Sequence, residues 1–205
     1  MRKSRRGVIV RPRSPAGIES FWNAANVVTL ARIGLSPLLL LLPWFSGPRW
    51  SVVVGFGFLA VSLTDLLDGY LARRRAGVTR IGKLLDPLAD KLLVMTAFVV
   101  LIAVGRIPYW GIVLVVLILG REFAVTSLRA MASSEGAVLS SNLVGKLKTG
   151  LQIAAITALL VHYPLFGVDA HVLGLVLLAT AAALTVWSGY RYFAEYLGGE
   201  IDPGP

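Results

Sequence analysis

The stretch DLLDGYLARRRAGVTRIGKLLDPLAD, residues 65–90, places four carboxylates among residues that otherwise look like membrane spans. Asp65 and Asp68 are three residues apart and Asp86 and Asp90 four apart, so each pair shares one face of a helix. Two such helices packed together would bring the four acids into one small volume. The acids would repel each other there unless a cation lies between them or some are protonated. Hard divalent cations such as Mg²⁺ take oxygen ligands, so the stretch predicts a metal site at a membrane surface.

The same acids have a simpler interpretation as solvated helix caps or as ion-pair partners of nearby bases. Five bases lie between the two pairs: Arg73, Arg74, Arg75, Arg80 and Lys83. This interpretation suffices for one acid pair. It does not explain two pairs that each have small residues on the same helix face, and we therefore favour the metal site.

Composition places the chain among polytopic membrane proteins. Of its 205 residues 56% are hydrophobic and 15% are charged, and the mean hydropathy is +0.75. These values are too apolar for an ordinary soluble domain. The chain has no cysteine, which excludes disulfide and thiolate chemistry. Its net charge is +9, but the bases lie beside hydrophobic spans, which favours anionic lipid headgroups and phosphorylated substrates over nucleic acid as partners.

Six apolar runs predict an all-α integral membrane protein with six transmembrane helices. Each run is near the ~20 residues that are needed to cross a bilayer. The second starts near Trp50 and includes the first half of the acidic stretch, and the third runs from about Leu84 to Gly105 with Asp86 and Pro87 in its first turn. The other four runs cover about 26–46, 108–132, 144–163 and 170–197.

The chain divides into a basic N-terminal arm (1–16), a six-helix domain (17–197) and a short C-terminal tail (198–205). We expect the arm to lie on anionic lipid headgroups, and a short amphipathic interfacial helix to precede the first span. Bases concentrate in the arm, in the 73–83 loop and in the 129–148 loop. The positive-inside tendency therefore places both termini and the acidic stretch on the cytoplasmic side.

Several bases fall inside the spans or at their cytoplasmic ends, where they are costly and usually functional. Arg121 and Arg129 are eight residues apart and so nearly on one helix face, and Glu122 beside Arg121 indicates a polar network in the interior. Lys146 and Lys148 open the fifth span. Snorkelling to the headgroups remains an equal alternative for Lys148. Together these bases predict a phosphate pocket in which arginine supplies a bidentate fork.

The acidic stretch resembles the signature of the CDP-alcohol phosphotransferase family at every fixed position. The eight matching residues are Asp65, Asp68, Gly69, Ala72, Arg73, Gly82, Asp86 and Asp90. The segments NVVTLARI, LLDPLADKLL, GREF and GKLKT are similar to the bacterial phosphatidylglycerophosphate synthase branch of that family. The resemblance covers about residues 23–195.

This resemblance implies transfer of a phosphatidyl group from CDP-diacylglycerol to glycerol 3-phosphate with release of CMP. It further implies a divalent metal, Mg²⁺ or Mn²⁺, a homodimer, and a bacterial inner-membrane location with the active site facing the cytoplasm. Asp65, Asp68 and Asp86 would hold the metal, and Asp90 would complete the carboxylate cluster and take the proton from the acceptor hydroxyl. The CDP and pyrophosphate site would be lined by Asp68, Gly69, Ala72, Arg73 and Gly82. The acceptor phosphate would be bound by Arg121, Arg129, Lys146 and Lys148, with Arg32 and Thr29 as further candidates.

Three alternatives remain open. A sister enzyme uses phosphatidylglycerol as the acceptor and makes cardiolipin, and another uses inositol phosphate. The third is an ion transporter whose carboxylates line an ion path. A transporter predicts acids near the middle of the membrane, whereas the acids here gather at one end of their helices beside a basic loop.

Overall fold

The structure is a computed structural model. It describes residues 30, 33–34, 36–41, 47–72, 80–134 and 143–197, and within these ranges it describes the side chains of residues 30, 33–34, 36–41, 47–63, 89, 91–131, 145 and 147–194. The basic arm, the expected interfacial helix and the C-terminal tail therefore lie outside the described residues.

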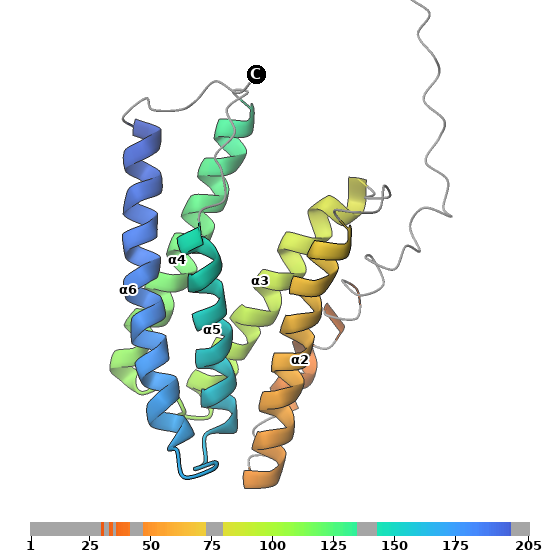
Figure 1. Ribbon diagram of the computed structural model, residues 1–205, viewed down its shortest axis with the longest axis vertical. Coiled ribbons are helices and arrows are strands. Elements are labelled where there is room, and N and C mark those ends of the chain that lie inside the picture. Colours follow the sequence, from red (N-terminus) through yellow and green to blue (C-terminus); the bar gives the residue numbers. More distant parts are fainter. Residues whose placement is uncertain are drawn as a thin grey trace, which may run out of the picture.

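The described chain is helical (Figure 1). One 3₁₀ helix, η2 (Ser36–Leu41), precedes five α-helices: α2 (Pro48–Ala72), α3 (Arg80–Ala103), α4 (Tyr109–Ser134), α5 (Leu143–Val161) and α6 (Ala170–Leu197). Extended pairing in this part of the chain is limited to one bridge between Leu165 and Val168, in the turn before α6. The expectation of an all-α protein is confirmed for the described residues.

Within the part of the chain that the structure describes, two helices are long and apolar enough to cross a membrane, over Tyr109–Met131 of α4 and Ala170–Ala194 of α6. They correspond to the fourth and sixth predicted spans. The second, third and fifth predicted spans appear as shorter apolar segments of α2, α3 and α5. These helices begin and end within a few residues of the predicted positions because long apolar runs set them, whereas six complete crossings stay a prediction.

Two prolines change details of the prediction. The described part of the first predicted span is not one continuous α-helix, since the chain forms η2 where Pro37 follows Ser36. Proline has no N–H to donate, and its ring clashes with the carbonyl four residues earlier. The expected place of Asp86 and Pro87 in the first turn of the third helix is wrong, because α3 begins at Arg80, four residues before the predicted start near Leu84, and includes Pro87 in its second turn. The helix extends past this proline although one backbone hydrogen bond is lost there.

Helix α5 is the central element of the bundle. It packs against α6, α2 and α3, and α6 also packs along α4. The fully buried side chains include Phe98 of α3, Ile118 of α4, and Ile156 and Leu159 of α5. Close approach of α6 to α5 depends on Gly174, because a Cβ there would lie 2.9 Å from the backbone nitrogen of Leu159. Small residues at such crossings are the usual means of packing helices in a membrane.

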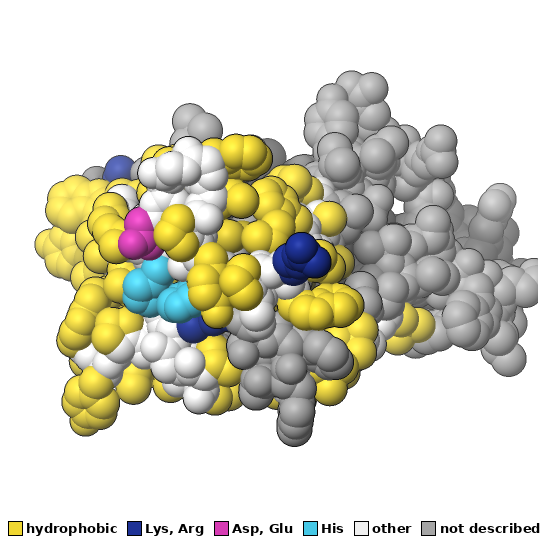
Figure 2. Space-filling view, turned by 90° about the horizontal axis from the view of Figure 1, so that it is seen from below, with side chains coloured by type: hydrophobic (Ala, Val, Ile, Leu, Met, Phe, Trp, Pro, Cys, Tyr) yellow, Lys and Arg dark blue, Asp and Glu magenta, His cyan; other side chains and the backbone are white. Residues whose placement is uncertain are grey.

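The two ends of the bundle differ in chemistry. The end viewed in Figure 2 is mainly apolar, with His162, His171 and Asp169 grouped near the α5–α6 connection. Arg106 is buried at this end, only 4% exposed. Its guanidinium donates to the Ser51 hydroxyl of α2 over 2.7 Å and to the carbonyl oxygens of the last turn of α5, at Leu159 and Leu160. One side chain thus joins α2, α5 and the α3–α4 connection.

Exposed tryptophan and tyrosine side chains occur near both ends of the long apolar helices. Tyr109 and Trp110 start α4 with 91% and 56% exposure, and Trp187 and Tyr190 lie near the end of α6 with 58% and 69% exposure. Such aromatic residues favour the two interfaces of a bilayer. Together with the apolar helices between them, they are the features of a helical membrane protein.

Candidate functional site

The acidic stretch lies at one end of the bundle. Asp65 and Asp68 are in the last two turns of α2, and Asp86 and Asp90 are in the first three turns of α3. Only seven residues separate the two helices, so the chain turns back at this end (Figure 1). Asp65, Asp68 and Asp86 therefore lie toward the ends of their helices, as predicted, whereas Asp90 lies nearer the middle of α3 because this helix begins at Arg80. The four side chains lie outside the described part, so their convergence stays a prediction.

The side chains of the other predicted residues of the acidic stretch also lie outside the described part. Gly69 and Ala72 are in the last turn of α2, and Gly82 is in the first turn of α3. Arg73 lies outside the described residues, as do Arg32 and Thr29. Among the side chains that the structure describes, no group of three or more His, Cys, Asp or Glu residues is placed to hold a metal ion. The metal-site prediction accordingly depends on the four aspartates.

The predicted arginines of α4 meet at one aromatic ring of α6. Arg129 donates from Nη2 to the hydroxyl of Tyr192 over 2.5 Å, and its guanidinium carbon lies 5.1 Å from the ring centroid. The guanidinium carbon of Arg121 lies 5.4 Å from the same centroid. Tyr192 is only 6% exposed. The ring thus holds two positive charges close together in a partly dehydrated place, an arrangement that attracts an anion.

Arg121 also rests on the backbone of α6. A Cβ built at Gly189 would lie 2.9 Å from the Cγ atom of Arg121, so the missing side chain leaves room for the aliphatic part of the arginine. Gly189 and Tyr192 are three residues apart and therefore share one helix face. The Nε atom of Arg121 is buried and has no hydrogen-bond partner. A buried donor without a partner is costly and is best explained by a ligand oxygen or a water.

Lys148 of α5 reaches the same region. It is 3% exposed and forms an ion pair with Glu122 of α4, whose carboxylate oxygen lies 4.0 Å from Arg121 Nη1. The snorkelling alternative for Lys148 is therefore wrong, because its side chain is buried and its ammonium group pairs with the half-buried carboxylate of Glu122. Arg121, Arg129, Lys148, Glu122 and Tyr192 are called the basic cluster below. Its three cations and one carboxylate give a net charge of +2.

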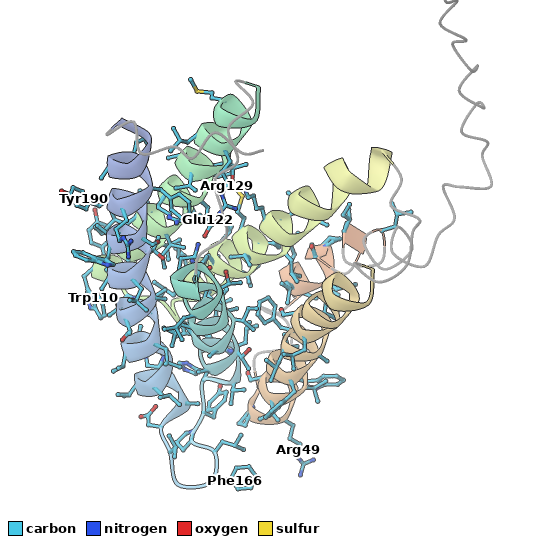
Figure 3. The ribbon with its side chains drawn as sticks, turned by 45° about the horizontal axis from the view of Figure 1, so that its top comes forward. Arg49, Trp110, Glu122, Arg129, Phe166 and Tyr190 are labelled. Atoms are coloured by element: carbon cyan, nitrogen blue, oxygen red, sulfur yellow. The ribbon has the colours of Figure 1, made fainter. Side chains whose placement is uncertain are left out.

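Figure 3 shows where the cluster lies in the bundle. Glu122 and Arg129 are on the half of α4 away from Arg49 and Phe166, which mark the opposite end. The chain direction places the end of α2, the start of α3 and the start of α5 on the cluster's side (Figure 1). Lys146 is on the first turn of α5, and its side chain is outside the described part. The four predicted phosphate-binding bases of α4 and α5 and the predicted acids of α2 and α3 thus belong to the same half of the molecule.

A small cavity adjoins the cluster between α3, α4 and α5. Its volume is about 40 Å³, and its polar lining consists of Lys91, Glu122, Thr149 and Gln152. The Lys91 ammonium donates to the hydroxyl of Thr126, which in turn donates over 2.7 Å to the carbonyl of Glu122. Gln152 is 4% exposed, and its Nε2 atom has no hydrogen-bond partner. The lining of the cavity therefore includes a buried polar donor that has no partner.

Sequence reasoning missed Tyr192, Gly189, Gln152 and Lys91. Two of them had a usable signal. Gln152 is a polar residue inside an apolar run and is four residues after Lys148, so it shares that lysine's helix face. Lys91 follows Asp90 directly within the third predicted span. Tyr192 and Gly189 gave no such signal, because aromatic and small residues are common throughout α6.

Comparisons with known proteins agree with the resemblance seen in the sequence. Residues 22–187 match the model of the CDP-alcohol phosphatidyltransferase family. The CDP-diacylglycerol–glycerol-3-phosphate 3-phosphatidyltransferase of Bacillus subtilis is 39% identical over 186 residues, covering 85% of this chain and 95% of the relative. A probable phosphatidylglycerophosphate synthase of Mycobacterium tuberculosis is 38% identical, covering 89% and 85%. A CMP-forming cardiolipin synthase of rice is 36% identical, covering 83% of this chain but 56% of the relative.

Both the family model and the bacterial relatives extend over most of the chain, from the first predicted span to α6. The eight signature residues and the charged members of the basic cluster fall within the range that the family model matches, and Tyr192 lies five residues beyond it. The chain belongs to the CDP-alcohol phosphatidyltransferase family, and within it resembles the bacterial phosphatidylglycerophosphate synthases.

Proposed function

We propose that the chain transfers the phosphatidyl group of CDP-diacylglycerol to glycerol 3-phosphate, giving phosphatidylglycerophosphate and CMP. The printed activities of the Bacillus and Mycobacterium relatives support this assignment. The observation that carries it is the buried, unpartnered Nε atom of Arg121, beside a second guanidinium on the Tyr192 ring. A donor of this kind needs an oxygen ligand, and a phosphate that belongs to the acceptor supplies one.

The basic cluster fits a small phosphorylated alcohol. Arg121 and Arg129 present planar donors that match phosphate oxygens, and Lys148 adds a point charge. Glu122 reduces the positive charge and fixes Lys148, which keeps the lysine pointed inward. Lys146, Arg32 and Thr29 complete the proposed set, although their side chains are outside the described part. The phosphate bound here would leave the acceptor hydroxyl directed to the acidic stretch in the same half of the bundle.

The donor set of the acidic stretch fits a divalent cation. Four carboxylates from two helix ends are hard oxygen ligands, and members of this family generally depend on a divalent metal. Asp65, Asp68 and Asp86 would hold Mg²⁺ or Mn²⁺, with Asp90 completing the cluster. When bound, such an ion neutralises charge on the pyrophosphate. Asp68, Gly69, Ala72, Arg73 and Gly82 would bind the CDP part, where small residues let the nucleotide approach the backbone.

The proposed reaction is one displacement at phosphorus. The acceptor oxygen forms a bond to the phosphorus that carries diacylglycerol, and the bond from this phosphorus to the bridging oxygen breaks. CMP leaves with the bridging oxygen. Asp90 takes the proton of the acceptor hydroxyl, which is the role of a general base. Positioning and charge stabilisation supply most of the acceleration in such transfers.

The proposed setting is the bacterial inner membrane, with the active site and both termini on the cytoplasmic side. There the acyl chains of the donor stay in the bilayer while CDP and glycerol 3-phosphate stay in water. The basic arm would contact anionic headgroups, and the chain would act as a homodimer. The apolar helices with aromatic residues near both ends support the membrane location.

A second candidate is cardiolipin synthesis with phosphatidylglycerol as the acceptor. The identity to the rice cardiolipin synthase supports it, and the basic cluster would also accept a phosphodiester. Phosphatidylglycerol carries one negative charge at its phosphate, whereas glycerol 3-phosphate carries nearly two at neutral pH. The net charge of +2 in the cluster therefore favours glycerol 3-phosphate.

Release of CMP from CDP-diacylglycerol tests the proposal. The purified chain is assayed with Mg²⁺, Mn²⁺ or EDTA, and with glycerol 3-phosphate, phosphatidylglycerol, inositol phosphate or no acceptor. We expect release that needs both a divalent metal and glycerol 3-phosphate. Release with phosphatidylglycerol or inositol phosphate alone would move the chain to a sister activity. Metal flux into liposomes without CMP release would favour an ion transporter.

Two aspartate variants separate the proposed roles of the acidic stretch. Asp90→Asn removes the proposed base, so we expect transfer to fall by at least about 100-fold while binding of CDP-diacylglycerol is largely retained. Asp68→Asn removes a proposed metal and pyrophosphate ligand, so both transfer and donor binding should weaken. Donor binding is measured by protection of each variant against thermal unfolding. Equal loss of binding in the two variants would contradict a separate role for Asp90.

A further inference from the structure

The cavity beside the basic cluster has a composition that differs from that of the cluster. Its polar lining combines a carboxylate, Glu122, with the amide of Gln152, and apolar side chains such as Leu119 and Ile153 form the remaining walls. An amide N–H donates and a carboxylate accepts. The group that satisfies both at once is a hydroxyl, because its oxygen accepts one hydrogen bond and its hydrogen donates another.

The unpartnered amide nitrogen indicates that the cavity binds something polar. Gln152 is 4% exposed, and its Nε2 atom has no hydrogen-bond partner. Buried polar side-chain atoms nearly always have a partner, so a native chain keeps such a donor only for a ligand or a water. The volume of about 40 Å³ is enough for roughly three water-sized groups, since one water needs roughly 10–15 Å³. This is room for a hydroxymethylene fragment.

The residues that line the cavity connect it with the basic cluster and, along the sequence, with the acidic stretch. Glu122 lines the cavity and is also the partner of Lys148 in the basic cluster. Lys91 lines it from α3, one residue after Asp90. Binding of a hydroxymethylene fragment in this cavity requires that an acceptor whose phosphate lies on the arginines and whose reacting hydroxyl is directed to the acidic stretch has its middle carbon next to the cavity.

We propose that the cavity binds the acceptor hydroxyl that does not react, with Gln152 Nε2 donating to it and Glu122 accepting from it. This inference rests on the proposed function, since it assumes a phosphorylated acceptor with a second hydroxyl. Gln152 is then a specificity-determining residue. It selects a glycerol-type acceptor over an alcohol phosphate of the same length that lacks the second hydroxyl.

The test compares two acceptors that differ only in that hydroxyl. 3-Hydroxypropyl phosphate keeps the phosphate and the primary alcohol of glycerol 3-phosphate but has hydrogen at the middle carbon. The value of kcat/KM for CMP release is measured with each acceptor for the unmodified chain and for Gln152→Met, which keeps the side-chain length and removes the amide. Gln152→Leu serves as the second variant where Gln152→Met does not fold.

We expect the unmodified chain to prefer glycerol 3-phosphate by about 10- to 100-fold, because a site built to bond a hydroxyl rejects the analogue that lacks it. Gln152→Met should reduce this preference at least about tenfold, chiefly through lower kcat/KM with glycerol 3-phosphate. The control is Thr157→Val on the same helix, where the threonine hydroxyl donates over 2.8 Å to the carbonyl of Ile153. Its preference should equal that of the unmodified chain.

Two results would overturn the inference without affecting the proposed function. One is an active chain that uses both acceptors equally well, and the other is a preference that Gln152→Met leaves unchanged. Absence of CMP release from either acceptor by the unmodified chain would instead contradict the proposed function. The midpoint of thermal unfolding is measured for each variant. A midpoint within a few degrees of that of the unmodified chain shows that the substitution changes acceptor recognition and not folding.

Discussion

Tyr192 is the residue on which the two arginines of α4 depend for their positions. Its hydroxyl accepts from Arg129, and its ring faces both guanidinium groups. Two guanidinium groups that share one ring repel each other, and the electron-rich face of the ring offsets part of that repulsion. Tyr192 is therefore a positioning residue for the proposed phosphate site.

Substitution of Tyr192 should affect the acceptor more than the donor. Tyr192→Phe keeps the ring and loses one hydrogen bond, so we expect the KM for glycerol 3-phosphate to rise about threefold to tenfold with a smaller change in kcat. Tyr192→Leu also loses the ring and should raise this KM further. Steady-state kinetics with each substrate varied in turn measures both effects. An equal rise in the KM for CDP-diacylglycerol would indicate a general structural role instead.

His162 connects protonation to stability at the opposite end. Burial lowers the pKa of His162 below its ordinary value of 6.5, and the nearby charges of Arg106 and His171 lower it further, whereas Asp169 raises it. Its Nδ1 lies 3.2 Å from Nδ1 of His171. Because the folded state favours the neutral ring, the stabilising contribution is present above the unfolded-state pKa and is lost as the pH falls through the folded-state pKa.

The midpoint of thermal unfolding in detergent should therefore decrease as the pH is lowered from about 7 to about 5. His162→Asn should show a smaller decrease, since the variant has no titrating ring at this position. Asparagine is the matched replacement because residue 162 has φ of 63°, a left-handed conformation that asparagine tolerates. An identical pH dependence in the two proteins would contradict the assignment to His162.

Helix α6 contributes one face to the site, and its sequence does not indicate which face this is. The helix is apolar on nearly all sides, so hydrophobic periodicity does not indicate which face is turned inward. Only the packing against α4 and α5 places Gly189 and Tyr192 beside the arginines. By contrast, Arg121, Arg129 and Lys148 were predictable, because a charge inside an apolar run needs a polar partner whichever way the helix is rotated.

Gly189→Ala tests whether α6 seats Arg121. The added Cβ would lie 2.9 Å from the arginine's Cγ, which is in the middle of the side chain and must move. We expect the KM for glycerol 3-phosphate to rise several-fold, with little change in the KM for the donor. Gly120→Ala on α4 is the control, since a Cβ there meets no atom within 4 Å. Normal acceptor kinetics in Gly189→Ala would show that Arg121 tolerates the displacement.

At the scale of the whole molecule, the sequence predicted the helices and their order well, because long apolar runs separated by polar turns leave few other arrangements in a bilayer. The details that it did not predict are local. The start of α3 before Pro87 and the 3₁₀ helix at Pro37 depend on how neighbouring helices compensate for a lost backbone hydrogen bond. The cavity at Gln152 depends on side chains from three helices, a packing result that one-dimensional patterns do not contain.

The absence of cysteine makes the proposed orientation directly testable. Phe166, 95% exposed in the α5–α6 connection, and Ser134, the last residue of α4, belong to opposite ends of the bundle. In intact cells or spheroplasts, we expect a membrane-impermeant maleimide to label Phe166→Cys and not Ser134→Cys. In inside-out vesicles the labelling should be reversed. Labelling of Ser134→Cys from the outside would place the basic loops and the proposed site on the outer side of the membrane, which would contradict the proposed orientation.

Arg106 has a consequence for the cell that goes beyond stability. Charged side chains inside a helical bundle can allow protons to leak across a membrane. A continuous polar path through the bundle would dissipate the proton gradient. The guanidinium that joins α2 to the last turn of α5 closes the end opposite the basic cluster, and its own positive charge repels protons and metal ions there. In the proposed reaction, the water-soluble substrates would therefore enter only from the end of the basic cluster, and the membrane around the chain would remain electrically tight.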